Sequence, residues 1–168
     1  MNQPNTLPKA IIVDLDGTMT NYAHRAHLLN TTTRLANGRR DLAPFFDAMG
    51  DDTEHGWCRD IIDEAQAKGV KIIFLTGRPE KYRQLSEQWL DRHGITNYEV
   101  LLMRETRDFR PGAVVKAEIY RAEIEGKYDV LYAIDDNPHI LRMWAQLGIR
   151  CLYCGTAEDL AGGNDMTP

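Results

Sequence analysis

The chain has 168 residues, of which 43% are hydrophobic and 27% charged, and its formal net charge is −5 at pH 7. This length predicts a single domain, residues 1–168, with enough apolar side chains to bury a core. The negative charge argues against nonspecific binding along a nucleic-acid duplex, which requires a broad basic face. A small basic pocket that grips one phosphorylated end is compatible with this charge.

No apolar run approaches the roughly 20 residues that span a bilayer, and residues 1–8 are too polar for a signal peptide. Three cysteines make a poor disulfide framework, which favours a reducing compartment. We therefore expect a cytoplasmic protein that does not contact a membrane. Cys151 and Cys154 have C-x-x-C spacing without a second Cys or His pair, so a buried last strand is favoured over a zinc or redox site.

Strand-like apolar runs alternate along the chain with helical patterns, which predicts β-α-β units and an α/β fold with a parallel sheet. The first strand is expected at 10–13 and the second at 70–75. Three further strands are expected at 99–103, 130–134 and 150–153.

Four helices are predicted between these strands, three of which begin at a proline. Helical periodicity places Trp57, Ile61 and Ala65 on the buried face of the first. Trp57, Trp89 and Trp144 are all expected to pack in the core rather than stack on a substrate. The expected helices cover 57–68, 79–93, 111–125 and 138–148.

Residues 20–52 have no clear periodicity, although 42–49 could form a short helix. An insertion of this length directly after the first strand is expected to form a small lid or cap over the carboxyl end of the sheet. His24 and His27 in this segment are more easily explained as surface residues than as substrate contacts. Residues 161–168 are expected to form a disordered tail.

The first strand leads into Asp14-Leu15-Asp16-Gly17-Thr18, where two carboxylates stand two residues apart. Strand alternation points both to the same face if both lie on the strand. Like charges this close are tolerated only with a cation or a shared proton, and a divalent, oxygen-preferring metal such as Mg²⁺ is the simplest resolution. One aspartate could then attack an electrophile while the other moves protons.

Ligands of open parallel sheets bind beyond the carboxyl ends of the strands, and further polar clusters lie there. Thr76-Gly77-Arg78 follows the second strand and could form an anion cradle, although a turn with a capping threonine would look alike. Lys116 lies one turn into a helix among apolar neighbours. It could deliver its charge to a phosphate or a carboxylate, and the alternative is a solvated surface lysine.

Asp135 and Asp136 follow the apolar run 130–134. Two adjacent carboxylates opposite the first acidic pair would complete an oxygen-ligand metal site. The alternative is helix capping by Asp136 or Asn137, which does not explain two consecutive acids after an apolar strand.

Taken in order, these four clusters resemble the motifs of the haloacid dehalogenase superfamily of phosphotransferases, over residues 9–154. The resemblance implies a doubly wound, Rossmann-like sheet and a Mg²⁺-dependent phosphatase. Asp14 would be the nucleophile that forms an aspartyl-phosphate, and Asp16 would protonate the leaving alcohol and then activate water. Thr76 and Lys116 would hold the phosphoryl oxygens. The magnesium site would comprise Asp14, the backbone carbonyl of Asp16, Asp135 and Asp136.

Residues 102–151 resemble more narrowly the 3′-phosphatase domain of bacteriophage-type polynucleotide kinase/phosphatase, for example in Met103-Arg104-x2-Arg107-Asp108 and in Met143-Trp144-x2-Leu147-Gly148. This resemblance implies removal of a 3′-phosphate from a DNA or RNA end. The residues that would contact the substrate are Gly77, Arg78, Arg25, Arg104 and Arg107.

The chain departs from that family in two places. It has no G-x-x-x-x-G-K-[ST] loop, so no ATP site and no 5′-kinase half are expected in it. Arg110-Pro111-Gly112-Ala113 stands where the family favours an acidic residue. The cluster of Arg104, Arg107 and Arg110 could be a solvated loop or a contact to a nucleic-acid backbone.

Two alternative functions are compatible with the sequence. The same chemistry could act on a mononucleotide or another small phosphoester, which a closed cap would favour, whereas a short lid would admit a polymer end. A response-regulator receiver domain also combines clustered aspartates, Thr and Lys around Mg²⁺. In a receiver, however, a lone phosphoacceptor Asp lies in mid-chain, whereas here Asp-x-Asp comes first and Asp-Asp last.

Overall fold

The computed structural model describes residues 7–162, so residues 1–6 and 163–168 lie outside the described part. Five parallel strands form the central sheet in the order β5-β4-β1-β6-β7, and β2 and β3 form a separate antiparallel pair. The predicted α/β fold with a parallel sheet of about five strands is confirmed. The strands are β1 (Lys9–Val13), β2 (Thr20–Asn21), β3 (Thr53–Glu54), β4 (Lys71–Pro79), β5 (Val100–Arg104), β6 (Asp129–Asp135) and β7 (Cys151–Tyr153).

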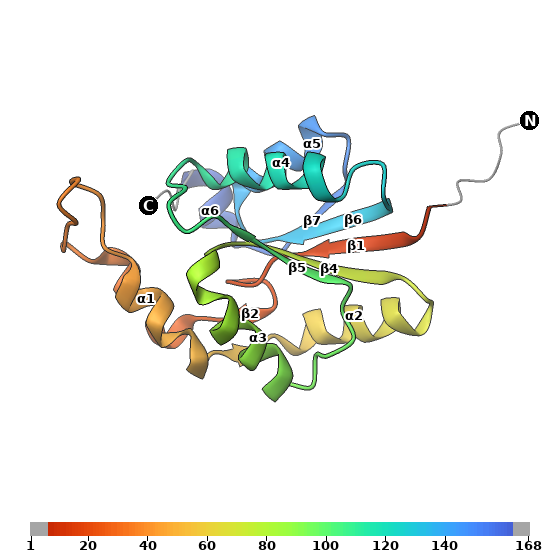
Figure 1. Cartoon of the computed structure of the whole chain (residues 1–168), viewed down its shortest axis with the longest axis horizontal. Coiled ribbons are helices and arrows are strands. Elements are labelled where there is room, and N and C mark those ends of the chain that lie inside the picture. The colour runs from red at the N-terminus through yellow and green to blue at the C-terminus, as the bar shows by residue number, and fades with distance from the viewer. Residues whose placement is uncertain (1–6, 163–168) are drawn as a thin grey trace, which may run out of the picture.

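Helices cover both faces of this sheet, with α4 and α5 on one side and α2 and α3 on the other (Figure 1). The α-helices are α1 (Ala43–Asp47), α2 (Gly56–Ala67), α3 (Arg83–Arg92), α4 (Gly112–Glu123), α5 (Pro138–Gln146) and α6 (Ala157–Gly162). Three 3₁₀ segments are η1 (Ala23–Asn30), η2 (Ala48–Asp51) and η3 (Glu80–Tyr82). None of the helices in residues 7–162 is long and apolar enough to cross a membrane.

Strand β1 is buried on both faces, which explains its uninterrupted apolar sequence. Ile11 and Val13 pack with residues of α2 and α3. Ala10 and Ile12 point the other way and pack with residues of α4 and α5. The sheet is therefore doubly wound. Successive strands are added on one side of β1 up to β5 and then on its other side from β6, so the strand order changes direction between β1 and β6.

The buried face of α2 differs from the sequence prediction. Cys58, Ile62 and Ala65 are buried, whereas the side chain of Trp57 is 41% exposed. The helix begins at Gly56, and its rotation carries Trp57 to the outer face, where its ring lies 5.9 Å from that of His55. The expectation of a core position was wrong for Trp57, and it is confirmed for the buried Trp89 and Trp144.

Two further boundaries differ from the prediction. Strand β4 continues to Pro79, so the Thr-Gly-Arg motif lies on an irregular strand end and not at a helix start. Residues 161 and 162 of the expected tail belong to α6, and 163–168 lie outside the described residues.

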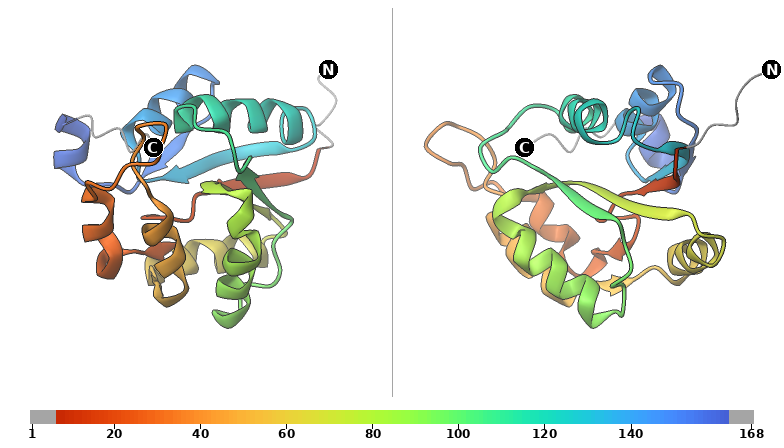
Figure 2. Two further views of the ribbon diagram at one scale, coloured as in Figure 1. Left: turned by 60° about the vertical axis from the view of Figure 1, so that its left-hand side comes forward. Right: turned by 45° about the vertical axis from the view of Figure 1, so that its right-hand side comes forward.

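Residues 20–52 fold against the domain. They comprise β2, η1, α1 and η2, and the expected short helix at 42–49 is present as α1. Phe45 and Met49 from this segment are buried in the structure. The loop between η1 and α1 extends away from the helices and lies beside the loop that precedes α4 (Figure 2).

The position of α2 predicts unequal effects of two truncations. Ile62→Ala removes a fully buried side chain and should lower the free energy of unfolding by about 2–5 kcal/mol. Trp57→Ala removes a larger but exposed side chain and should change it by about 0.5 kcal/mol or less. Urea denaturation of both variants measures the difference, and a larger loss for Trp57→Ala would contradict the orientation of α2.

Candidate active site

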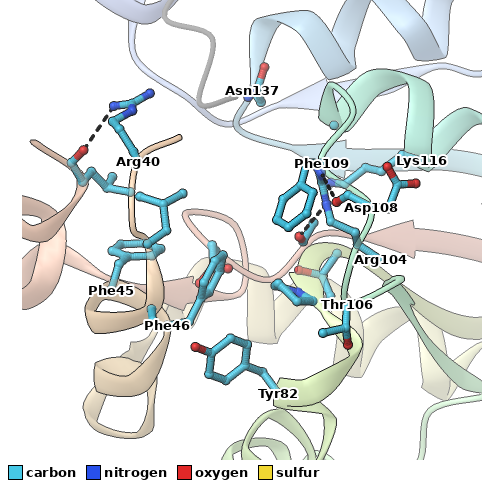
Figure 3. Close-up of a pocket in the computed structure, with 18 of the residues that line it drawn as sticks. Arg40, Phe45, Phe46, Tyr82, Arg104, Thr106, Asp108, Phe109, Lys116 and Asn137 are labelled. Atoms are coloured by element: carbon cyan, nitrogen blue, oxygen red, sulfur yellow. Dashed lines mark hydrogen bonds between the residues drawn. The ribbon is translucent and has the colours of Figure 1, made fainter. Parts of the chain in front are cut away.

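The carboxyl ends of β1, β4 and β6 lie at one edge of the sheet, at the point where the strand order changes direction. Asp14 follows β1, whereas Thr76 and Asp135 lie near the ends of β4 and β6. A cavity of about 490 Å³ opens above them (Figure 3). Its lining includes most of the predicted site: Asp14, Asp16, Thr76, Gly77, Arg104, Lys116, Asp135 and Asp136.

Lys116 enters this site from α4 and is almost completely buried. Its Nζ donates hydrogen bonds to Asp14 Oδ1 at 2.8 Å and to Asp135 Oδ2 at 2.6 Å. Burial alone would lower the pKa of the ammonium group, but the charges of Asp135 and Asp14 outweigh that effect and raise it. Lys116 is therefore a charged member of the site and not a solvated surface residue.

Three carboxylates gather around this lysine. Asp14, Asp135 and Asp136 each offer one oxygen, and these oxygens lie within 4.8 Å of one another. Burial raises the pKa of Asp14 from 3.8 to about 7, with Lys116 opposing the shift and Asp135 adding to it. Burial and the charges of Asp135 and Asp14 also raise the pKa of Asp136 well above its ordinary value. The cluster has more negative charge than Lys116 can balance, so its oxygens fit a hard divalent cation such as Mg²⁺.

The loop after β1 makes room for Asp136. Gly17 has a φ of +82°, and a Cβ at this position would lie 2.0 Å from Asp136 Oδ2. Only glycine can adopt this backbone conformation and leave that space. Of the two residues expected as alternative helix caps, Asp136 and Asn137, it is Asn137 that caps α5, because its side chain accepts a hydrogen bond from the backbone N–H of His139.

Asp16 has partners of its own. Arg78 donates to its two oxygens from Nε and Nη2 at 2.9 and 2.8 Å, and Arg25 Nη2 donates to Oδ1 at 2.5 Å. Burial by itself would raise the pKa of Asp16, but Arg78 and Arg25 together hold it well below its ordinary value. The two carboxylates of the Asp-x-Asp motif therefore balance their charges with different cations, whereas the sequence suggested that one cation would serve both.

Arg25 is fixed by a second acid that the sequence analysis did not identify. Its Nε and Nη2 donate to Asp52 Oδ1 and Oδ2 at 2.7 and 2.5 Å. Asp52 is buried, and its backbone carbonyl accepts a hydrogen bond from Trp89 Nε1. No periodicity or motif marks Asp52 in the sequence, because only the fold of residues 20–52 brings it to Arg25.

The expected substrate arginines lie in different environments. Arg25 and Arg78 are at most 1% exposed, and both guanidinium groups are bound to carboxylates, so they position Asp16 and do not face the cavity. Arg104 borders the cavity, yet it donates to the carbonyls of Gly77, Asp108 and Arg110. Arg25 and Arg78 thus contact Asp16, and a contact of Arg104 with the substrate stays a prediction.

The remaining candidate residues lie at the surface. Arg107 is exposed and is not among the residues that line the cavity. Arg110 forms ion pairs with Asp108 and Glu118 at 2.6 and 2.8 Å, which fits the solvated-loop interpretation of the basic cluster. His24 and His27 are both exposed, and His24 also contacts Asp52 Oδ1 at 2.9 Å.

A comparison with known families settles the classification. Residues 8–158 match the family model described as the polynucleotide kinase PNKP phosphatase domain, of the haloacid dehalogenase type. The chain belongs to this family. The resemblance seen in the sequence is thereby confirmed, and the protein is a haloacid-dehalogenase-type phosphatase domain.

Two relatives of this chain are longer proteins. It is 28% identical over 149 residues to a protein of Autographa californica nuclear polyhedrosis virus named "Putative bifunctional polynucleotide kinase/RNA ligase", covering 87% of this chain and 19% of the viral protein. It is 32% identical to a chain of the Pnkp1/Rnl/Hen1 RNA repair complex, with a TM-score of 0.73 over 91% of this chain and 44% of the other. The phosphatase domain thus spans less than half the length of these relatives.

A more distant structure shares only the fold. The class C acid phosphatase from Bacillus anthracis aligns over 95% of the phosphatase domain and 72% of its own chain, with a TM-score of 0.67 and 15% identity. The same fold therefore occurs in proteins whose sequences differ widely.

Breaking the buried ion pair of Arg25 should destabilise the phosphatase domain. Asp52→Asn removes the negative charge that accepts hydrogen bonds from Arg25 Nε and Nη2. Removing one partner of a buried ion pair lowers the free energy of unfolding by about 3–5 kcal/mol. Asp51→Asn changes the neighbouring exposed acid and serves as the control. A urea denaturation midpoint equal for the two variants would show that Asp16 alone balances Arg25.

The raised pKa of Asp14 predicts a pH-dependent stability without metal. Between pH 3.8 and about 7, folded Asp14 retains a proton that the unfolded chain has released, so this group makes the free energy of unfolding fall as the pH rises. Asp14→Asn should therefore gain stability relative to wild type from pH 4 to pH 8 in EDTA, as measured by urea denaturation. Asp60→Asn, at an exposed position, is the control, and a difference independent of pH would contradict this environment of Asp14.

Proposed function

We propose that this phosphatase domain is a Mg²⁺-dependent phosphomonoesterase that forms an aspartyl-phosphate on Asp14 and removes 3′-phosphates from polynucleotide ends. The observation that carries the proposal is the meeting of Asp14, Lys116 and the acidic pair Asp135-Asp136 at the floor of one cavity. Family membership and the RNA repair complex that contains a relative support the polynucleotide substrate.

Mg²⁺ held by Asp14, Asp135, Asp136 and the backbone carbonyl of Asp16 would neutralise charge on the phosphoryl oxygens. Asp14 attacks phosphorus through a carboxylate oxygen, and the bond from phosphorus to the 3′-oxygen breaks. Lys116 orients Asp14 through its hydrogen bond and adds a positive charge beside the transferring group. The Thr76 hydroxyl and the backbone at Gly77 border the cavity and receive the remaining phosphoryl oxygens.

Asp16 donates a proton in the first step and accepts one in the second. Arg25 and Arg78 favour its ionised form and hold its pKa low. The negative charge of a bound phosphate would act in the opposite direction and favour protonation of Asp16. Protonated Asp16 gives its proton to the leaving 3′-oxygen. The resulting carboxylate then takes a proton from the water that attacks the aspartyl-phosphate, which releases inorganic phosphate and restores Asp14.

The setting of the site supports two further parts of the proposal. Loop 31–42, within the insertion 20–52, borders one side of the cavity and acts as a short lid. The cysteines Cys58, Cys151 and Cys154 are all free thiols, which agrees with a reducing, cytoplasmic compartment.

Hydrolysis of a mononucleotide is the second candidate. A cavity of about 490 Å³ falls within the size range of small-molecule sites, about 300–1,000 Å³. The family favours the polynucleotide end, because its description names a polynucleotide enzyme.

The proposal is tested by phosphate release with Mg²⁺ from a 3′-phosphorylated oligonucleotide, a 5′-phosphorylated one and a panel of mononucleotides. We expect a preference for the 3′-end, no turnover by Asp14→Asn, and a loss of about 10²–10³-fold for Lys116→Ala because a stabilising charge is removed. Lys68→Ala, at an exposed position on α2's C-terminal turn, is the control. Preference for mononucleotides would support the second candidate, and turnover by Asp14→Asn would exclude the covalent route.

A further inference from the structure

The cavity above the catalytic residues has two unlike parts. Its floor is polar and contains the residues that the proposed chemistry uses. Its outer part is mainly apolar and aromatic, although several charged and polar side chains also border it, and the proposed chemistry uses none of these side chains (Figure 3). The main contributors to this apolar wall are Leu42, Phe45, Phe46, Pro79, Tyr82 and Phe109.

One side of the wall is a cluster of aromatic rings from the insertion and from η3. Phe46 lies 5.2 Å from Tyr82 with an interplanar angle of 36°, and 5.4 Å from Phe45. The guanidinium carbon of Arg25 lies 3.9 Å from the ring centroid of Phe45. Because Arg25 also donates a hydrogen bond to Asp16, the position of these rings is fixed relative to the polar floor of the cavity.

The other side of the wall is Phe109, which is 37% exposed. The Arg39 guanidinium lies 4.7 Å from its ring centroid, and Arg39 Nη1 donates to its backbone carbonyl at 3.0 Å. Arg104 donates to the carbonyls of Asp108 and Arg110, which flank Phe109 on either side. An exposed aromatic side chain is thus held in place by polar contacts from two other segments of the chain.

We infer that this apolar wall binds the nucleobase of the terminal, 3′-phosphorylated nucleotide, with the base stacked on Phe109. The inference rests on the proposed function, because it places the 3′-phosphate on the polar floor. A phosphate bound there brings its attached nucleoside into the outer part of the same cavity. Aromatic side chains accept any base by stacking, since every base has a π-face, and sequence-tolerant binding suits an enzyme that acts on strand ends.

This arrangement has a consequence for the substrate. A base that stacks in the cavity cannot at the same time remain paired and stacked in a duplex, so the terminal nucleotide must be unpaired. A substrate without a base leaves the ring of Phe109 in water and loses that contact.

The test compares two 3′-phosphorylated single strands that differ only at the last residue, which is a nucleotide in one and an abasic tetrahydrofuran in the other. Wild type should have a kcat/KM about tenfold or more higher for the nucleotide end. Phe109→Ala should reduce this preference severalfold, and Phe109→Trp should retain it because the larger ring still stacks. Leu152→Ala, at an exposed apolar position on β7, is the matched control and should keep the wild-type preference.

The outcomes separate the inference from the proposed function. Equal kcat/KM of wild type for the two strands would overturn the base-binding wall and leave the 3′-phosphatase activity intact. Hydrolysis of neither strand, with p-nitrophenyl phosphate still cleaved, would overturn both. A preference retained in Phe109→Ala would remove Phe109 from the base contact.

Discussion

The site depends on the placement of one buried ammonium group between two carboxylates. Lys116 comes from α4, whereas Asp14 and Asp135 come from the ends of adjacent strands, and all three are buried. In a medium of low dielectric constant these carboxylates repel one another strongly unless positive charge lies among them. The packing of α4 over the sheet delivers that charge at a fixed distance. The residual negative charge favours a divalent cation at the same edge.

A second charge cluster stands beside the first and remains distinct from it. Asp16 and Asp52 share Arg25, and Arg78 reaches Asp16 from the end of β4. This division gives the two neighbouring aspartates opposite properties. The pKa of Asp14 is raised mainly by burial, and that of Asp16 is lowered by two arginines. Two aspartates that lie two residues apart in one loop therefore differ in the charge state that their surroundings favour.

Sequence patterns predicted the fold well where they repeated along an element. The apolar strands, the glycines that end the helices and the parallel arrangement of the sheet were recognisable, because strand and helix periodicities are local properties. Trp57 shows the limit of such reasoning. A helix pattern read one residue out of phase places a tryptophan in the core, whereas the actual rotation of α2 exposes it.

The sequence by itself determined the α/β fold and the identity of the polar residues that gather at the strand ends, since parallel strands bring their carboxyl ends to one edge. Only the tertiary structure decided which charges pair. Asp52 and Arg25 meet through an irregular segment that has no periodicity, and Arg104, which borders the cavity, donates to the backbone carbonyls of Asp108 and Arg110. The apolar wall of the cavity likewise contains Phe46 and Phe109, which come from distant parts of the chain. Long-range contacts of this kind depend on the path of loops, and no local pattern records that path.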